Sequence, residues 1–194
     1  MKCDIVLAGV GGQGILSIAA IIDRMALKQG LNLKQAEVHG MAQRGGAVQS
    51  NLRLSDRPVA SDLIPRGQAD LLLSVEPMET LRYIDFLAKD GALVSSASPF
   101  VNISDYPKIE KVLEALRAVE RHVLIDTRAL AKEAGNARVE NTVMLGAASP
   151  FLPLDADRLR DEVGEVFAGK GERIVEVNRK AFTLGREAAL ARAV

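Results

Sequence analysis

Short apolar segments alternate with segments of helical periodicity over the first two-thirds of the chain. The segment at 3–8 is an apolar run ending next to a glycine, the pattern of a strand buried on both faces of a parallel sheet. The segment at 47–55 alternates apolar and polar residues, as a half-exposed strand does. The predicted strands are residues 3–8, 33–38, 47–55, 69–76, 92–98 and 122–127.

Predicted helices lie between these strands and fill the rest of the chain. Residues 15–30 repeat apolar side chains at helical spacing up to Gly30, and Pro77 takes the favoured first position of a helix over 77–91. The other predicted helices are residues 109–119, 128–135, 141–149, 156–169 and 171–193. This order predicts the α/β class, a three-layer α/β/α fold with a mostly parallel (mixed) sheet and a helical C-terminal region over about 128–194.

Length and charge narrow the class of protein. A chain of 194 residues predicts a single domain, residues 1–194, and 25 basic side chains balance 25 acidic ones, which disfavours a nucleic-acid partner. No apolar run reaches the roughly 18 residues of a membrane span, and no signal-peptide pattern opens the chain. We therefore expect a cytoplasmic protein with neither nucleic acid nor membrane as a partner.

The cysteine and histidine counts limit the metal chemistry. The chain has one cysteine, Cys3, and two histidines, whereas an iron–sulfur cluster normally needs four thiolates and a structural zinc site four Cys or His ligands. Cys3 lies inside the first apolar run, so we interpret it as a small buried hydrophobic residue. The sequence predicts no metal ligand in this chain.

A glycine-rich segment follows the first predicted strand and precedes the first predicted helix. Gly9, Gly11 and Gly14 fit the pattern G-x-G-x-x-G, in which backbone amides and a helix N-terminus approach a phosphate. Gln13 would add an amide to the mouth of such a site, and no Gly-Lys-Ser/Thr follows to make a nucleotide-triphosphate loop. The alternative is a tight strand-to-helix turn in which the glycines serve only positive φ and close packing.

A second glycine-rich segment, residues 39–46, carries polar donors. His39, Gln43 and Arg44 lie among glycines and can donate to an anionic group, although a solvated turn before a strand is the alternative. A lone histidine such as His39 is also more often a structural hydrogen-bonding residue than a catalyst. Glu37 stands where a dinucleotide-binding domain carries its acidic residue.

Two further residues have both a binding and a structural interpretation. Glu76 ends a predicted strand where ligands collect in α/β sheets, or it caps the helix that follows. Asn141 precedes a predicted helix, and we favour an N-cap over a ligand.

Four spaced motifs together resemble a known family. GVGGQG at 9–14, EVHGMAQRGG at 37–46, ADLLLSVEPMETLR at 69–82 and NTVMLGAASPF at 141–151 are similar to the gamma-type domain of 2-oxoacid:ferredoxin oxidoreductases. The form HGMAQRGG most resembles the small subunits of the indolepyruvate branch. The resemblance runs over nearly the whole chain and in the family's order.

The resemblance implies a reaction and a division of labour between subunits. An aryl pyruvate, coenzyme A and oxidised ferredoxin would give an aryl-acetyl-CoA, carbon dioxide and reduced ferredoxin. Thiamine diphosphate, Mg and iron–sulfur clusters would belong to a large alpha subunit of a hetero-oligomer that reduces ferredoxin. The residues agree, because this chain has one cysteine and no Gly-Asp-Gly motif for magnesium diphosphate. We expect no cofactor to be held by this chain.

We take no residue of this chain as catalytic. The candidate binding residues are Gly9, Gly11, Gly12, Gln13, Gly14, His39, Gln43, Arg44, Gly45 and Gly46. They would bind the phosphates or pantetheine arm of coenzyme A, or dock the large subunit. Two other functions stay open, a stand-alone NAD(P)- or FAD-binding Rossmann-type oxidoreductase and a module that only binds a larger chain. The preferred 2-oxo acid and the stoichiometry do not follow from the sequence.

Overall fold

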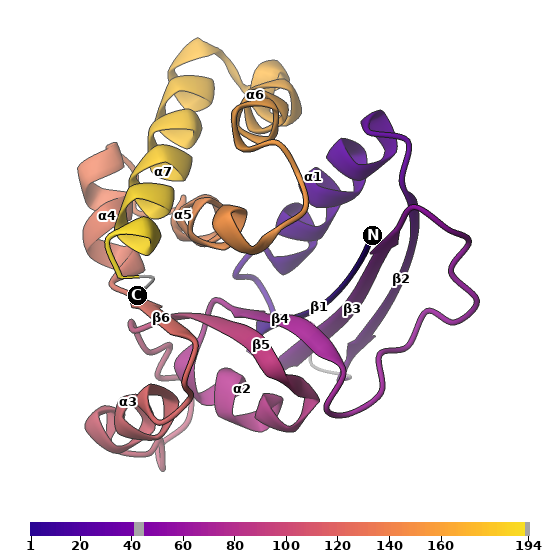
Figure 1. Ribbon diagram of the computed structural model, residues 1–194. Helices are drawn as coiled ribbons and strands as arrows, with labels where there is room; N and C mark the ends of the chain where they lie inside the picture. The colour runs from indigo at the N-terminus through magenta and orange to yellow at the C-terminus, as the bar shows by residue number, and fades with distance from the viewer. Residues whose placement is uncertain (41–44, 193–194) are drawn as a thin grey trace.

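A six-stranded sheet forms the centre of the protein in the computed structural model, which describes residues 1–40 and 45–192 (Figure 1). The strands are β1 (Lys2–Val10), β2 (Asn32–His39), β3 (Ala47–Ser55), β4 (Ala69–Ser74), β5 (Leu87–Ser96) and β6 (His122–Ile125). They lie in the order β2-β3-β1-β4-β5-β6. β3 is antiparallel to both neighbours and the other pairs are parallel, so five strands share one direction. The prediction of a mixed, mostly parallel sheet is confirmed.

Helices cover both faces of the sheet and make the three predicted layers (Figure 1). One face carries α1 (Ile15–Lys28), α4 (Thr127–Ala134), α5 (Glu140–Ala148), α6 (Ala156–Phe167) and α7 (Glu172–Leu190) over the larger apolar core. The other face carries α2 (Pro77–Arg82) and α3 (Ile109–Arg117) over a smaller core. Everything after β6 that the structure describes is helix or connecting turn, as predicted.

One predicted helix is shorter than expected. The helix predicted over 77–91 ends at Arg82 and is followed by a short 3₁₀ turn, Ile84–Phe86, before β5 begins at Leu87. Tyr83, Ile84 and Phe86 pack against the smaller core, and Leu87 pairs with Ala69 of β4. Burial against the sheet and strand pairing therefore override the local helical pattern.

The C-terminal helices pack through two glycines. A Cβ on Gly146 of α5 would lie 2.0 Å from the carbonyl oxygen of Phe182, and one on Gly185 of α7 would lie 1.9 Å from that of Val143. The backbones of α5 and α7 therefore touch directly, and only glycine fits at either position. No helix in the described ranges has the length and apolar character needed to cross a bilayer.

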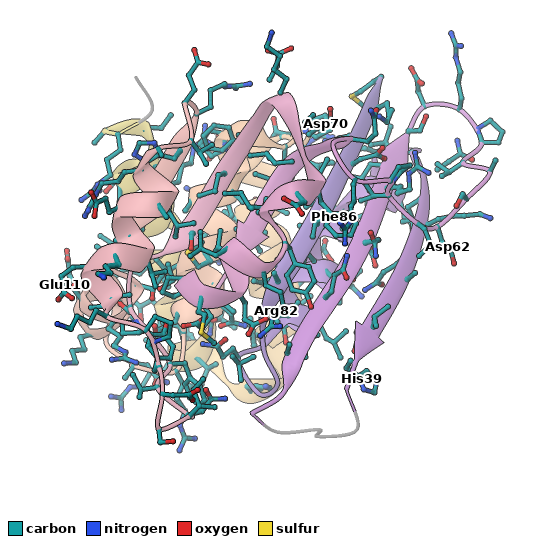
Figure 2. All side chains as sticks on the ribbon, turned by 90° about the horizontal axis from the view of Figure 1, so that it is seen from below. His39, Asp62, Asp70, Arg82, Phe86 and Glu110 are labelled. Atoms are coloured by element: carbon teal, nitrogen blue, oxygen red, sulfur yellow. The ribbon has the colours of Figure 1, made fainter. Side chains whose placement is uncertain are left out.

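The connections that follow β1 and β4 indicate where on the sheet a ligand site is expected. β1 continues into α1 on one face, whereas the neighbouring strand β4 continues into α2 on the other face. In open α/β sheets, ligands bind beyond the carboxyl ends of the strands at such a change of face. We call the end at which β1, β2, β4, β5 and β6 finish the carboxyl end of the sheet. Figure 2 shows His39 there, at the finish of β2.

Candidate functional site

The glycine loop between β1 and α1 needs glycine for several separate reasons. Gly12 and Gly14 have φ angles of +101° and +80°, in the left-handed region that L side chains rarely adopt. A Cβ on Gly9 would lie 2.4 Å from Cγ2 of Val75 at the end of β4. The loop thus turns tightly and packs closely, as its structural interpretation requires.

The side chain of Gln13 is used inside the loop. Its Oε1 accepts a hydrogen bond from the Val10 amide at 2.8 Å, and its Nε2 donates to the Val75 carbonyl at 3.4 Å. Gln13 therefore ties the loop after β1 to the loop after β4, across the change of face between these strands. The Gln13 side chain therefore stabilises the loop, whereas the sequence suggested that its amide would face the mouth of a phosphate site.

The first turn of α1 offers backbone donors. The amides of Ser17 and Ile18 donate to the Gly14 carbonyl at 3.0 and 3.2 Å. Among the described residues, no protein acceptor is found for the amides of Gly12, Gly14, Ile15 and Leu16. Free amides at a helix N-terminus favour a negatively charged group.

A pocket of about 350 Å³ opens beside these amides. It is lined by Val10, Gly11, Gly12, Gly14, Ile15, Leu16, Glu37, His39 and Val48. Glu37 and His39 are two apart on β2, so both face the α1 side, and His39 Nε2 lies 4.0 Å from Glu37 Oε1. Its wall thus combines an apolar surface with a carboxylate, an imidazole and helix amides.

The pocket is not the usual dinucleotide site. In a doubly wound dinucleotide domain, the strand that carries the ribose-binding acidic residue follows the first helix and adjoins the first strand. Here the antiparallel strand β3 lies between β1 and β2, so Glu37 is one strand farther from the glycine loop.

The two glycine-rich segments meet in the structure. Gly11 donates to the Gly46 carbonyl at 2.8 Å and accepts from the Gly45 amide at 3.2 Å. Gly45 has a φ of +78°, and its carbonyl accepts a 2.6 Å hydrogen bond from Nδ2 of Asn102. Predicted site residues 34 and 35 positions apart in the sequence are therefore adjacent. Gln43 and Arg44 lie outside the described residues.

Asn141 is not the N-cap that the sequence favoured. Val139 is the N-cap of α5, and Asn141 is the second residue of the helix. Its Nδ2 lies 2.6 Å from the position that a Cβ on Gly14 would occupy, so the amide stands against the glycine loop. Sequence reasoning missed this contact because no local pattern links positions 14 and 141.

Glu76 caps a helix, which confirms its structural interpretation. Its carboxylate accepts from the Glu79 amide at 2.8 Å and caps α2. The same carboxylate accepts from Tyr106 Oη at 2.5 Å and from the Phe100 amide at 3.3 Å. Burial, followed by the hydrogen bond to Glu76, raises the pKa of Tyr106. Glu76 is completely buried and holds the loop after β5.

Cys3 behaves as the sequence predicts. It is buried in the larger core, and burial, with a smaller contribution from Asp70 and Asp4, raises the pKa of its thiol to about 12. A thiol of this kind stays protonated and does not ligate a metal. Among the described residues, no group of three or more His, Cys, Asp or Glu side chains is placed to hold a metal ion.

The fold and the loops define a class, an open α/β domain with a glycine loop at the carboxyl end of its sheet. Comparison with known proteins makes the class specific. Residues 4–188 match the family described as pyruvate ferredoxin/flavodoxin oxidoreductase, and the chain belongs to this family. The resemblance seen in the four motifs is thereby confirmed.

Relatives and solved structures match this chain over nearly its full length. It is 39% identical to the indolepyruvate oxidoreductase subunit IorB of Pyrococcus horikoshii (96% of this chain, 95% of that one) and 34% identical to the subunit of the same name from Archaeoglobus fulgidus (98% and 96%). The gamma subunit of a keto/oxoacid ferredoxin oxidoreductase from Geobacter sulfurreducens has a TM-score of 0.69 at 26% identity, covering 97% of this chain and 99% of its own.

A larger protein contains the same fold. The 2-oxoglutarate:ferredoxin oxidoreductase of Magnetococcus marinus, solved with 2-oxoglutarate, coenzyme A and succinyl-CoA bound, has a TM-score of 0.79 at 22% identity. The match covers 98% of this chain but 31% of that one. In that protein the fold is therefore about one-third of a longer polypeptide.

Proposed function

We propose that this chain is the small (beta) subunit of an indolepyruvate ferredoxin oxidoreductase. The observation that carries the proposal is the 39% identity to the Pyrococcus horikoshii subunit over nearly the full length of both chains. The assembled enzyme decarboxylates an aryl pyruvate oxidatively, transfers the aryl-acetyl group to coenzyme A and passes the released electrons to ferredoxin. The compartment we propose is the cytoplasm.

The redox chemistry belongs to the partner, a large alpha subunit. Thiamine diphosphate with Mg would supply the carbanion chemistry on the 2-oxo carbon there, and iron–sulfur clusters would accept the electrons. The single cysteine of this chain supports the assignment, because Cys3 is buried with a pKa of about 12 and a cluster needs several thiolates. Ferredoxin is reduced through the complex.

This chain contributes an anion-binding wall for coenzyme A. The amides of Gly12, Gly14 and the first turn of α1 can donate hydrogen bonds to a phosphate. Gly11, Gly45 and Gly46 hold the two loops together. Gly9 and Gln13 brace the loop, and His39 with Gln43 and Arg44 completes the proposed set. We choose coenzyme A because the Magnetococcus marinus protein, about one-third of which shares this fold, was solved with coenzyme A bound.

Reconstitution tests the function. The chain is mixed with the large subunit of an indolepyruvate oxidoreductase. The reduction of a viologen dye, which accepts the electrons, is followed with indolepyruvate, phenylpyruvate, pyruvate and 2-oxoglutarate, each with and without coenzyme A. We expect activity only in the mixture, dependent on coenzyme A and fastest with the aryl pyruvates. A preference for pyruvate or 2-oxoglutarate would contradict the proposed substrate.

The stand-alone Rossmann oxidoreductase makes the opposite prediction. A fluorescence titration of the chain alone with NADH or FAD should give no saturable binding if the proposal is right. Saturable binding together with NAD-dependent oxidation by the isolated chain would replace the subunit assignment.

A further inference from the structure

The exposed large apolar side chains are concentrated at one end of the sheet. Of the nine large hydrophobic residues that the described part of the chain exposes, five lie at the carboxyl end of the sheet. We call them the apolar rim, and they are Leu16, Val38, Phe100, Val101 and Ile103. Leu16 is in the first turn of α1, Val38 is next to last in β2, and the other three follow β5. Leu16 lines the pocket beside the glycine loop, and the segment after β5 reaches that loop through Asn102, which donates to the Gly45 carbonyl.

The part of the rim that follows β5 is held in place by hydrogen bonds. The Phe100 amide and the Tyr106 hydroxyl both donate to the buried carboxylate of Glu76, and Asn102 Nδ2 donates to the Gly45 carbonyl. Between these anchors Val101 is 67% exposed, more than any other large hydrophobic residue described. The loop thus holds apolar side chains in water in a fixed position, which is typical of a binding surface prepared in advance.

We infer that the apolar rim is the surface that docks the large subunit, so that the glycine-loop pocket lies at the junction of two chains. The inference rests on the proposed function, which supplies the partner. Two links tie the rim to the pocket, since Leu16 lines the pocket and Asn102 binds the same Gly45 that pairs with Gly11. A partner seated on the rim therefore lies next to the pocket.

The comparisons favour the large subunit over a second copy of this chain. In the Magnetococcus marinus protein this fold is joined to about twice its own length of other polypeptide. A surface that packs against those other domains becomes, in a separate small subunit, a contact with another chain.

Paired charge substitutions test the rim. The double variant Val101→Asp/Ile103→Asp is compared with Leu27→Asp and Leu63→Asp. These controls change residues exposed by 63% and 56%, one at the C-terminal end of α1 and one in the loop between β3 and β4. Isothermal titration calorimetry with the purified large subunit gives the dissociation constant of each. We expect the rim variant to bind at least tenfold more weakly and each control to stay within twofold of the wild type. Thermal unfolding midpoints verify that all variants fold, because these side chains are exposed.

Each outcome decides the inference. Equal binding by the rim variant and the controls overturns it, and so does a wild-type homodimer in sedimentation that the rim variant abolishes. If the complex forms in a rim-dependent way but oxidises no 2-oxo acid, the docking surface stands and the proposed function fails. If the complex is active and the rim variant binds normally, the function stands and the docking surface fails.

Discussion

The amide of Asn141 occupies the space that a side chain on Gly14 would need. Asn141 Nδ2 is 2.6 Å and its Cγ 3.0 Å from the ideal Cβ position at Gly14, whose φ is +80°. Glycine is therefore required at position 14 for two reasons. One is the backbone conformation, and the other is the close contact with Asn141, which is 127 positions later in the sequence. The start of α5 thus packs against the N-terminus of α1, where several amides have no acceptor among the described residues.

Coupling between these two positions follows from the contact. Gly14→Ala should reduce the free energy of unfolding by about 2–4 kcal/mol, combining left-handed strain with steric overlap. Asn141→Ala should cost less than about 1 kcal/mol and should recover part of the Gly14→Ala loss in the double variant. Urea denaturation of the four proteins gives the coupling energy, and strictly additive losses would show that the two side chains do not compete for space.

The contact between α5 and α7 predicts a large effect from one methyl group. Gly146→Ala places a Cβ 2.0 Å from the Phe182 carbonyl, so the helices must separate, at a cost of about 3 kcal/mol or more. Gly169→Ala is the matched control, because it lies in a 3₁₀ turn with open space around it and should change stability by less than about 0.5 kcal/mol. Thermal unfolding distinguishes them, and similar midpoints would mean that the helix packing is looser than described.

The architecture could be predicted from the sequence because its signals are local. Apolar runs and helical spacing located all six strands, and the glycine loop was placed correctly between β1 and α1. The order of the strands could not be predicted, because the insertion of β3 between β1 and β2 depends on pairing between distant residues. The same reason hid the Asn141 contact and the hydrogen bonds that bring Gly45 and Gly46 to Gly11.

A half-buried carboxyl on α1, that of Asp23, predicts a pH dependence of stability. Oδ1 of Asp23 has no hydrogen-bond partner among the described residues, and burial raises the pKa of Asp23 from 3.8 to about 6. The native state therefore binds this proton more tightly than the unfolded chain, so stability from Asp23 is complete below about pH 4 and is lost as the pH rises through 6.

Asp23→Asn removes the charge and tests this sign. The variant should match the wild type near pH 3.5 and exceed its unfolding free energy at pH 8 by about 1–2 kcal/mol, a value reduced for the partial exposure of the group. Asp62→Asn, at an exposed aspartate labelled in Figure 2, controls for the loss of one negative charge. A variant that is no more stable than the wild type at pH 8 would contradict the assignment.

A comparison of two glycines with positive φ can distinguish an effect on coenzyme A binding from an effect on stability. Gly12 and Gly30 have φ angles of +101° and +73°, and a Cβ on either would meet no atom of the described residues within 4 Å. Alanine should therefore cost each position a similar strain, about 1–2 kcal/mol. Of the two, only Gly12 lines the pocket, so only there can the added methyl group take up space that a ligand would use.

In the reconstituted enzyme, Gly12→Ala should raise the KM for coenzyme A by about tenfold or more, which corresponds to roughly 1.4 kcal/mol of lost binding. Gly30→Ala should leave this KM unchanged while lowering the unfolding midpoint to a similar extent, because its methyl group lies at the far end of α1. Steady-state kinetics with coenzyme A varied at saturating aryl pyruvate makes the comparison. Equal KM values for the two variants would remove Gly12 from the binding wall and leave the glycine loop a purely structural turn.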